Sequence, residues 1–185
     1  MVADVAELCG YERIVFIDKQ WPERTMNGRW SIVADAIIDD GSDVFFAAGD
    51  NTLRKRLFAE FEHVRSPVLV HPSAVISQSA LIGDGSLVMP GVVVNADTTI
   101  GKGAILNTAC SVDHDCTLGD FVHVSPGARL AGSTIVGCGT WICIGASVIQ
   151  NITLGRDVVV AAGAAVISNV PDNFCVGGVP ARPLS

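Results

Sequence analysis

One histidine in this 185-residue chain has acidic neighbours on both sides, in the sequence Asp113-His114-Asp115. Imidazole exchanges its proton near neutral pH, so such a side chain can remove a proton from an attacking nucleophile. A carboxylate that accepts the Nδ1 proton fixes the tautomer and leaves Nε2 free to act as the base. The tripeptide therefore predicts a general base, and the alternative is a surface histidine in a polar turn.

The other potential metal ligands and nucleophiles are less favourably spaced. A zinc hydratase needs three histidines that converge, and the remaining His63, His71 and His123 lack the close pair expected of one. The six cysteines form no C-x-x-C pair, so we expect them to be reduced and mostly buried. The sequence therefore predicts no metal site.

The elements that must position His114 repeat in hexads. Every sixth residue from Val70 to Val166 is aliphatic, and the residue four positions later is small or β-branched. The 17 aliphatic positions are Val70, Ile76, Ile82, Val88, Val94, Ile100, Leu106, Val112, Leu118, Val124, Leu130, Val136, Ile142, Val148, Leu154, Val160 and Val166. Three such hexads per turn make a triangular coil, and the pattern predicts a parallel β-helix of between five and six coils.

A second period, three hexads long, lies on top of the first. It is marked by five glycines, namely Gly83, Gly101, Gly119, Gly137 and Gly155. We expect this corner of each coil to need glycine for its backbone conformation. The positions three hexads before and after His114 hold Ala96 and Gly132, and these small residues leave space beside the imidazole.

The hexad positions also predict which side chains point inward. Positions one and five face the inside of the coil, whereas His114 is at position three and His123 at position six. Both histidines should therefore point outward. Cys110 and Cys116 occupy position five, which disfavours a covalent thiol mechanism.

Composition divides the chain and excludes several classes of protein. Residues 1–69 hold 20 charged residues and residues 70–185 hold 11, which predicts two architectures that meet near Ser66-Pro67. We expect domains at 1–66 and 67–171 and a capping tail at 172–185. The net charge of −7 argues against nucleic acid as a partner, and no apolar run reaches the roughly 18 residues of a membrane span. A cytoplasmic protein is the expectation.

The first segment predicts a small parallel α/β unit that would cap the coil. We expect a helix over 2–9 closed by Gly10, a buried strand over 13–18 and a second strand over 43–48. A basic helix should follow over 51–62, with Leu53, Leu57 and Phe61 on one face.

Residues 105–128 (ILNTACSVDHDCTLGDFVHVSPGA), with the following Leu130-Ala131-Gly132, closely resemble the hexapeptide-repeat acyltransferases of the sialic-acid O-acetyltransferase-like subgroup. The ending Gly178-Val-Pro-Ala-Arg182 is similar to the family's C-terminal signature. The resemblance implies a left-handed β-helix with a small Rossmann-like α/β domain before it. It also implies a homotrimer that uses acetyl-CoA, with nucleotide-linked amino-dideoxy sugars among the acceptors.

The same resemblance implies roles for individual residues. His114 would be the catalytic base and Asp115 its partner, although the family more often has Glu there. The Gly132 amide or His123 would lie near the acetyl carbonyl. The coenzyme would run along a ladder of residues three hexads apart, between coils of adjacent subunits, with Arg182 near its phosphates. That ladder comprises Pro126, Ile144, Ala162 and Pro180.

The nucleotide-sugar domain departs most from the family pattern. Family members begin with a strand and a Gly-rich turn that would hold phosphates at a helix N-terminus. This chain starts at Met1, already inside the expected helix, so the first strand and the turn are expected to be missing, either because the start is mis-set or because the site is lost. Asp18, Gly49, Asp50 and Asn107 match positions near the nucleotide or acceptor.

Three interpretations follow. The chain would be an acetyl-CoA-dependent N-acetyltransferase acting on a nucleotide-linked amino sugar by direct transfer. Alternatively, the acceptor would be a hydroxyl, as in sialic acid O-acetylation. The third interpretation is a γ-carbonic-anhydrase-like or non-catalytic coil.

Overall fold

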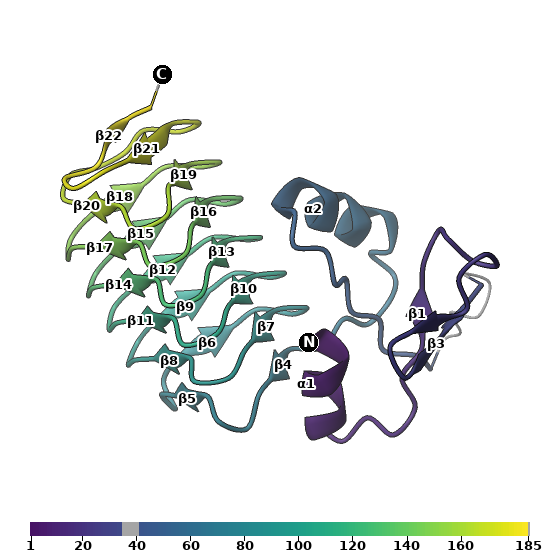
Figure 1. Cartoon of the computed structure of the whole chain (residues 1–185). Coiled ribbons are helices and arrows are strands. Elements are labelled where there is room, and N and C mark those ends of the chain that lie inside the picture. The colour runs from purple at the N-terminus through teal and green to yellow at the C-terminus, as the bar shows by residue number, and fades with distance from the viewer. Residues whose placement is uncertain (35–40, 185) are drawn as a thin grey trace.

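The second part of the chain is a triangular parallel β-helix, which Figure 1 shows as a stack of coils that ends at the C-terminus. The computed structural model describes residues 1–34 and 41–184. Between Leu69 and Val148, each strand of the stack pairs in parallel with the strand one coil later, as in Ile105↔His123 and Leu106↔Val124. The six-residue side and the coil of three hexads predicted from the sequence are confirmed.

The strands of the β-helix form three sheets, here called the first, second and third faces. The first face contains β4 (Leu69–Val70), β7 (Leu87–Val88), β10 (Ile105–Leu106), β13 (His123–Val124), β16 (Trp141–Ile142), β19 (Val159–Val160), β21 (Cys175–Gly177) and β22 (Arg182–Pro183). The second contains β5 (Val75–Ile76), β8 (Val93–Val94), β11 (Ser111–Val112), β14 (Arg129–Leu130), β17 (Ser147–Val148) and β20 (Ala165–Val166). The third contains β6 (Leu81–Ile82), β9 (Thr99–Ile100), β12 (Thr117–Leu118), β15 (Ile135–Val136) and β18 (Thr153–Leu154).

Three stacks of turns connect these faces. The first corner joins the first face to the second and includes Pro126. The second corner joins the second face to the third and includes His114. The third corner joins the third face back to the first and includes Phe121. Turns at equivalent places of successive coils lie directly over one another, so each corner is a ladder with one rung per coil.

The inside of the coil is filled as the hexad pattern predicts. Leu118, Val124 and Leu130 at position one are fully buried, and so are Cys110 and Cys116 at position five. Because each layer buries its apolar side chains only against the layers above and below, the coil forms one continuous core.

The glycine ladder has a different cause from the one expected. None of these five glycines has a positive φ, so backbone conformation does not select them. A Cβ added at Gly101 would lie 2.6 Å from the Asp120 nitrogen, and one at Gly137 would lie 2.5 Å from the Arg156 nitrogen. Glycine is needed because the main chain of the next coil passes too close for a side chain.

The two ends of the coil are closed differently. Helix α1 (Val2–Leu8) covers the first coil, where Val5 and Ala6 join the apolar core beside Leu69. At the other end, Val160 pairs with Val176, so the last coil is two residues shorter than the others. The predicted ladder step from Ala162 to Pro180 is therefore wrong.

The first segment contains a mixed three-stranded sheet in the order β1-β3-β2. Strand β1 (Phe16–Ile17) pairs in parallel with β3 (Trp30–Val33), which forms a hairpin with β2 (Met26–Asn27). The expected strand over 43–48 is not formed, although the Val44 amide donates to the Arg65 carbonyl. The strand expected over 13–18 is short, and Ile17 is exposed rather than buried.

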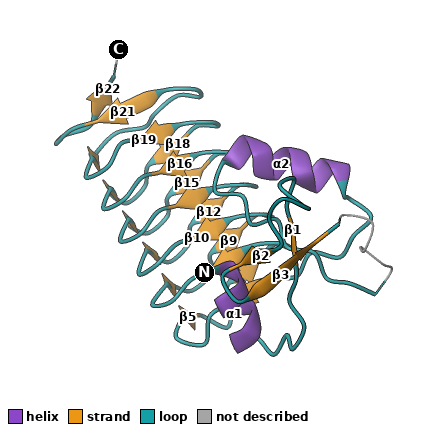
Figure 2. Cartoon of the chain, turned by 45° about the vertical axis from the view of Figure 1, so that its right-hand side comes forward, coloured by secondary structure: helices purple, strands orange, loops and turns teal. Residues whose placement is uncertain are grey.

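Helix α2 (Asn51–Glu60) lies beside the turns of the coil in Figures 1 and 2. On the predicted apolar face of this helix, Leu53 is exposed and Leu57 and Phe61 are half-buried, whereas the fully buried residue of the helix is Arg54. The main-chain carbonyls of the coil need hydrogen-bond donors, and a guanidinium supplies them where leucine cannot. No helix among the described residues is long and apolar enough to span a bilayer.

Candidate active site

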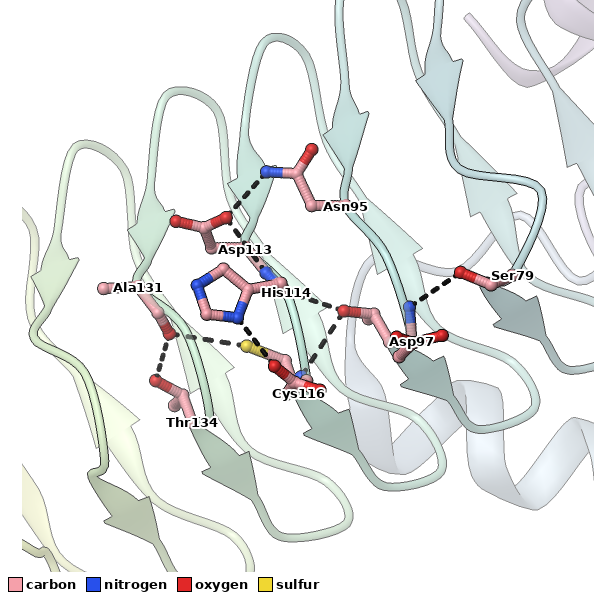
Figure 3. Close-up of polar contacts among 10 residues, drawn as sticks. Ser79, Asn95, Asp97, Asp113, His114, Cys116, Ala131 and Thr134 are labelled. Carbon is pink, nitrogen blue, oxygen red and sulfur yellow. Dashed lines mark hydrogen bonds and ion pairs between the residues drawn. The ribbon is translucent and has the colours of Figure 1, made fainter.

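His114 is held outward at the second corner by the coils on either side (Figure 3). The Asp115 amide donates to the Ala96 carbonyl of the preceding coil at 3.0 Å, and the Ser133 amide donates to the His114 carbonyl at 2.9 Å. Asp115 adopts a left-handed φ of +58°, a conformation that aspartate accepts more readily than most residues. The turn is therefore fixed by main-chain contacts, without using the imidazole.

Asp115 is the carboxylate that engages the imidazole. His114 Nδ1 lies 2.7 Å from Asp115 Oδ2, in a pair with 59% and 57% of the two side chains exposed. This hydrogen bond, with a smaller contribution from the charge of Asp113, raises the pKa of His114. Nε2 makes no hydrogen bond within the described residues, so it is available to a substrate.

Asp113 has a different task from that of Asp115. Its Oδ1 accepts hydrogen bonds from Asn95 Nδ2 at 2.7 Å and from the His114 amide at 2.9 Å (Figure 3). The Asn95 donor is the main cause that lowers the pKa of Asp113. Asp113 therefore braces the turn. Sequence reasoning missed Asn95. Its position one coil before Asp113 was the only indication in the sequence that the two side chains would meet.

Gly132 provides the floor on which the imidazole lies. A Cβ at this position would be 2.6 Å from His114 Cε1 and 2.7 Å from Nε2, so a side chain here would displace the ring. An open pocket of about 350 Å³ begins here. Its lining is Asp113, His114, Ala131, Gly132, Ser133, Gln150 and Asn151. Sequence reasoning missed Gln150 and Asn151. They lie two coils after His114 and Asp115, so the repeat of the coil could have identified them.

His123 lies in a separate environment on the first face. It is 9% exposed, and its ring stacks on Trp141 with centroids 5.8 Å apart. Asn107 Nδ2 lies 3.3 Å from Nε2, whereas Nδ1 is buried without a hydrogen-bond partner among the described residues. Burial, reinforced by the charge of Arg54, lowers the pKa of His123 to about 4. His123 is therefore neutral at pH 7, and it is not among the residues that line the His114 pocket.

The first corner carries an exposed apolar ladder. The Gly145 amide donates to the Pro126 carbonyl at 3.0 Å and the Gly163 amide to the Ile144 carbonyl at 2.9 Å, so the turns of Pro126, Ile144 and Ala162 stack as predicted. Ile144 is 58% exposed. An extended ligand could lie along this edge, which is one corner away from His114.

Known proteins share this fold. The acetyltransferase domain of PglB from Neisseria gonorrhoeae, in complex with acetyl coenzyme A, is 38% identical. The match covers 99% of this chain and 92% of that one, with a TM-score of 0.95. The chain belongs to the hexapeptide-repeat sugar acetyltransferases. Membership establishes the left-handed β-helix and the acetyltransferase class expected from the sequence.

Other comparisons agree with that assignment. A histidine-to-alanine mutant of GDP-perosamine N-acetyltransferase from Caulobacter crescentus, in complex with CoA and GDP-perosamine, is 37% identical over 100% of this chain and 90% of that chain, with a TM-score of 0.93. WeeI from Acinetobacter baumannii is 27% identical over 99% of this chain and 93% of that one, with a TM-score of 0.81. The PglD N-terminal domain family matches residues 1–61. No match was found among curated proteins.

The remaining candidate residues of this acetyltransferase have local partners. Asp50 is the N-cap of α2, where Oδ1 accepts from the Leu53 amide at 2.7 Å. Asp18 Oδ1 accepts from the Gln20 amide at 3.0 Å. The Gly49 carbonyl accepts from Arg54, and Arg182 on β22 donates to the Ala181 carbonyl. The structure does not bring these residues to His114.

Two cysteines inside the coil are poor nucleophiles. Cys110 and Cys116 are fully buried, and burial raises the pKa of Cys110 to about 12. A thiol in this state is not ionised at neutral pH. The expectation that most of the six cysteines are buried is wrong, since only Cys110 and Cys116 are buried. The half-buried cysteines are Cys138 and Cys143, and the exposed ones are Cys9 and Cys175.

Proposed function

We propose that this chain is an acetyl-CoA-dependent N-acetyltransferase that modifies the amino group of a nucleotide-linked amino sugar by direct transfer. The observation that carries the proposal is His114, whose Nδ1 contacts Asp115 while Nε2 is free over an open pocket. This is the arrangement that a general base requires. The GDP-perosamine and CoA bound by the Caulobacter relative support this choice of acceptor and donor.

The chemical step needs one base and no covalent intermediate on the protein. The sugar nitrogen attacks the thioester carbonyl carbon while His114 Nε2 takes the proton. The tetrahedral intermediate then expels the CoA thiolate, and the imidazolium returns its proton to that sulfur. Asp115 favours the imidazolium that forms in between, because its carboxylate accepts the Nδ1 hydrogen bond.

The oxyanion and the coenzyme require further groups. The Gly132 amide makes no hydrogen bond within the described residues and could donate to the oxygen of the tetrahedral intermediate. We assign Ile144, Ala162 and Arg182 to the coenzyme, and His123 to hydrogen bonding near the acetyl group as a neutral imidazole. Asp18, Gly49, Asp50 and Asn107 are assigned to the acceptor. The domains proposed are 1–66 for the acceptor, 67–171 for acyl transfer and 172–185 as a cap.

A homotrimer would bring these parts together. His114 is at the second corner, whereas Ile144 belongs to the apolar ladder of the first corner of the same chain. If three copies pack side by side, the ladder of one copy can face His114 of its neighbour. We place the enzyme in the cytoplasm, where its acetyl donor would be available.

The test is release of free thiol from acetyl-CoA against UDP-, dTDP- and GDP-linked amino sugars, with sialic acid as the hydroxyl acceptor. We expect one nucleotide amino sugar to react, and His114→Ala to lose at least about a hundredfold in kcat/KM. His63→Ala is the matched control, because His63 is exposed on the first segment. Reaction with sialic acid alone would replace N-acetylation by O-acetylation, and reaction with no acceptor would refute both.

Trimerisation has a separate test. Light scattering gives the mass in solution, and mixing an inactive His114→Ala chain with an inactive Ile144→Arg chain tests whether sites are shared. Because each mixed trimer would contain some sites with both residues intact, activity should return on mixing. A monomer, or mixed chains that stay inactive, would contradict the shared site.

A further inference from the structure

Arg54 is a fully buried cation that forms no ion pair with any described residue. It is 1% exposed, and no carboxylate oxygen of the described residues lies within ion-pair distance of it. Burial lowers the pKa of its guanidinium to about 10, with the charge of Asp50 acting in the opposite direction. Buried charges are normally paired, because an uncompensated charge in the interior is costly. Such a residue needs a specific explanation.

The charge is compensated by oxygens from both parts of the molecule. On the side of the first segment, Nη1 donates to the Ala48 carbonyl at 2.9 Å and to the Gly49 carbonyl at 3.4 Å. On the side of the coil, Nε donates to the Gly103 carbonyl at 2.6 Å and Nη2 to the Phe121 carbonyl at 3.1 Å. The guanidinium therefore ties the loop before α2 to two successive coils.

Asn51 extends this contact to a third coil. Its Oδ1 accepts from Arg54 Nη2 at 2.7 Å, and its Nδ2 donates to the Gly139 carbonyl at 2.9 Å. The coil oxygens thus belong to residues 103, 121 and 139, which are one rung apart on the third corner. The polar groups of the first turn of α2 therefore match carbonyls that recur once per coil. Beside this contact, the rings of Phe58 and Phe121 pack edge to face, with centroids 5.3 Å apart.

The same contact lies next to His123 and Asn107. Phe121 precedes β13, where His123 lies, and the Arg54 charge is one of the influences on that imidazole. The tied loop, Ala48 to Asn51, contains two residues assigned above to the acceptor, Gly49 and Asp50. A small displacement of this loop would therefore move the acceptor relative to the coil.

We propose that Arg54 is a positioning residue for the acceptor: it locks loop 48–51 onto the third corner, and so sets where the nucleotide sugar lies relative to the acyl-transfer coil. The proposal rests on the proposed function for its kinetic consequence, but the lock itself does not depend on activity. Lysine cannot replace arginine here. The planar guanidinium donates to carbonyls of the loop and of the coil at the same time, and a single ammonium group cannot reach both.

The test compares Arg54→Lys and Asn51→Ala with Arg56→Lys, an exposed position on the same helix that serves as control. Hydrogen–deuterium exchange should become faster in the peptide that covers residues 44–54 of both variants, with the peptides of residues 124–166 unchanged. In kinetics with the nucleotide sugar that wild type uses, we expect KM for the sugar to rise by about fivefold or more. KM for acetyl-CoA should stay within about twofold.

Each alternative outcome has a clear meaning. If both KM values change together, or neither changes, Arg54 has a general structural role and the proposal is wrong. Unchanged exchange in residues 44–54 also overturns it. If wild type acetylates no sugar in the panel, the proposed function fails, whereas the exchange experiment still decides whether the lock exists. Asn51→Ala keeps the arginine, so it serves where Arg54→Lys does not fold.

Discussion

Replacing Gly132 by alanine should disable His114 without disturbing the coil. Gly132 has no positive φ, so alanine can adopt its backbone conformation. The new Cβ would lie 2.6 Å from Cε1 and 2.7 Å from Nε2 of the imidazole, against 3.4 Å or more in ordinary contacts. The ring must therefore withdraw by about 0.8 Å, and its Nε2 edge is partly covered. Misplacement of a catalytic group by about 1 Å can cost about a hundredfold in rate.

We therefore expect Gly132→Ala to lower kcat by about tenfold to a hundredfold in the thiol-release assay. The melting temperature should stay close to that of wild type, because the methyl group meets only an exposed side chain. His114→Ala with Gly132→Ala is the decisive control: if glycine acts through the imidazole, the double variant is no slower than His114→Ala alone. Wild-type kcat in Gly132→Ala, or full additivity in the double variant, would refute the reasoning.

Three further predictions concern the base, a thiol and the core. Asp115→Ala should move the acid limb of the kcat/KM pH profile to lower pH. His114 must be neutral to act as the base, and its hydrogen bond to Asp115 raises its pKa, so loss of that bond lowers the pKa. Native Cys110 should resist iodoacetamide, with mass spectrometry as the measurement, and ready modification would contradict its burial. Leu130→Ala should destabilise the fold by about 2–5 kcal/mol in urea unfolding, whereas exposed Ile135→Ala should change stability little.

The coil could be predicted in detail because the same pattern of aliphatic and small residues recurs in every hexad. Seventeen aliphatic positions agree on one period, so the inward positions and the outward direction of His114 followed without any structure. The choice of Asp115 over Asp113 as the partner of the imidazole did not follow from spacing. Both carboxylates adjoin His114, and only the Asn95 side chain of the preceding coil, which engages Asp113, separates their roles.

The first segment was harder because its elements are short and do not repeat. The hairpin of β2 and β3 was missed although its two-residue turn, Gly28-Arg29, begins with a glycine, whose φ is +62°. The two-residue turns that join such strands need a positive φ, which glycine adopts easily. The alternation of strands and helices was given more weight than this local signal, and a strand was expected at 43–48 that is not formed.

The burial of Arg54 in α2, which the sequence did not indicate, has a different physical origin. Leucines and phenylalanine at fourfold spacing normally mark the buried face of a helix, since apolar side chains are the ones that leave water. Here the partner surface is a corner of a β-helix, which presents a row of main-chain carbonyls beside the Phe121 ring. Arg54 is buried because it satisfies two of these oxygens, at Gly103 and Phe121. The sequence of the helix alone cannot reveal that Arg54 is buried. The carbonyls that need a hydrogen-bond donor belong to the coil, and they recur once per coil.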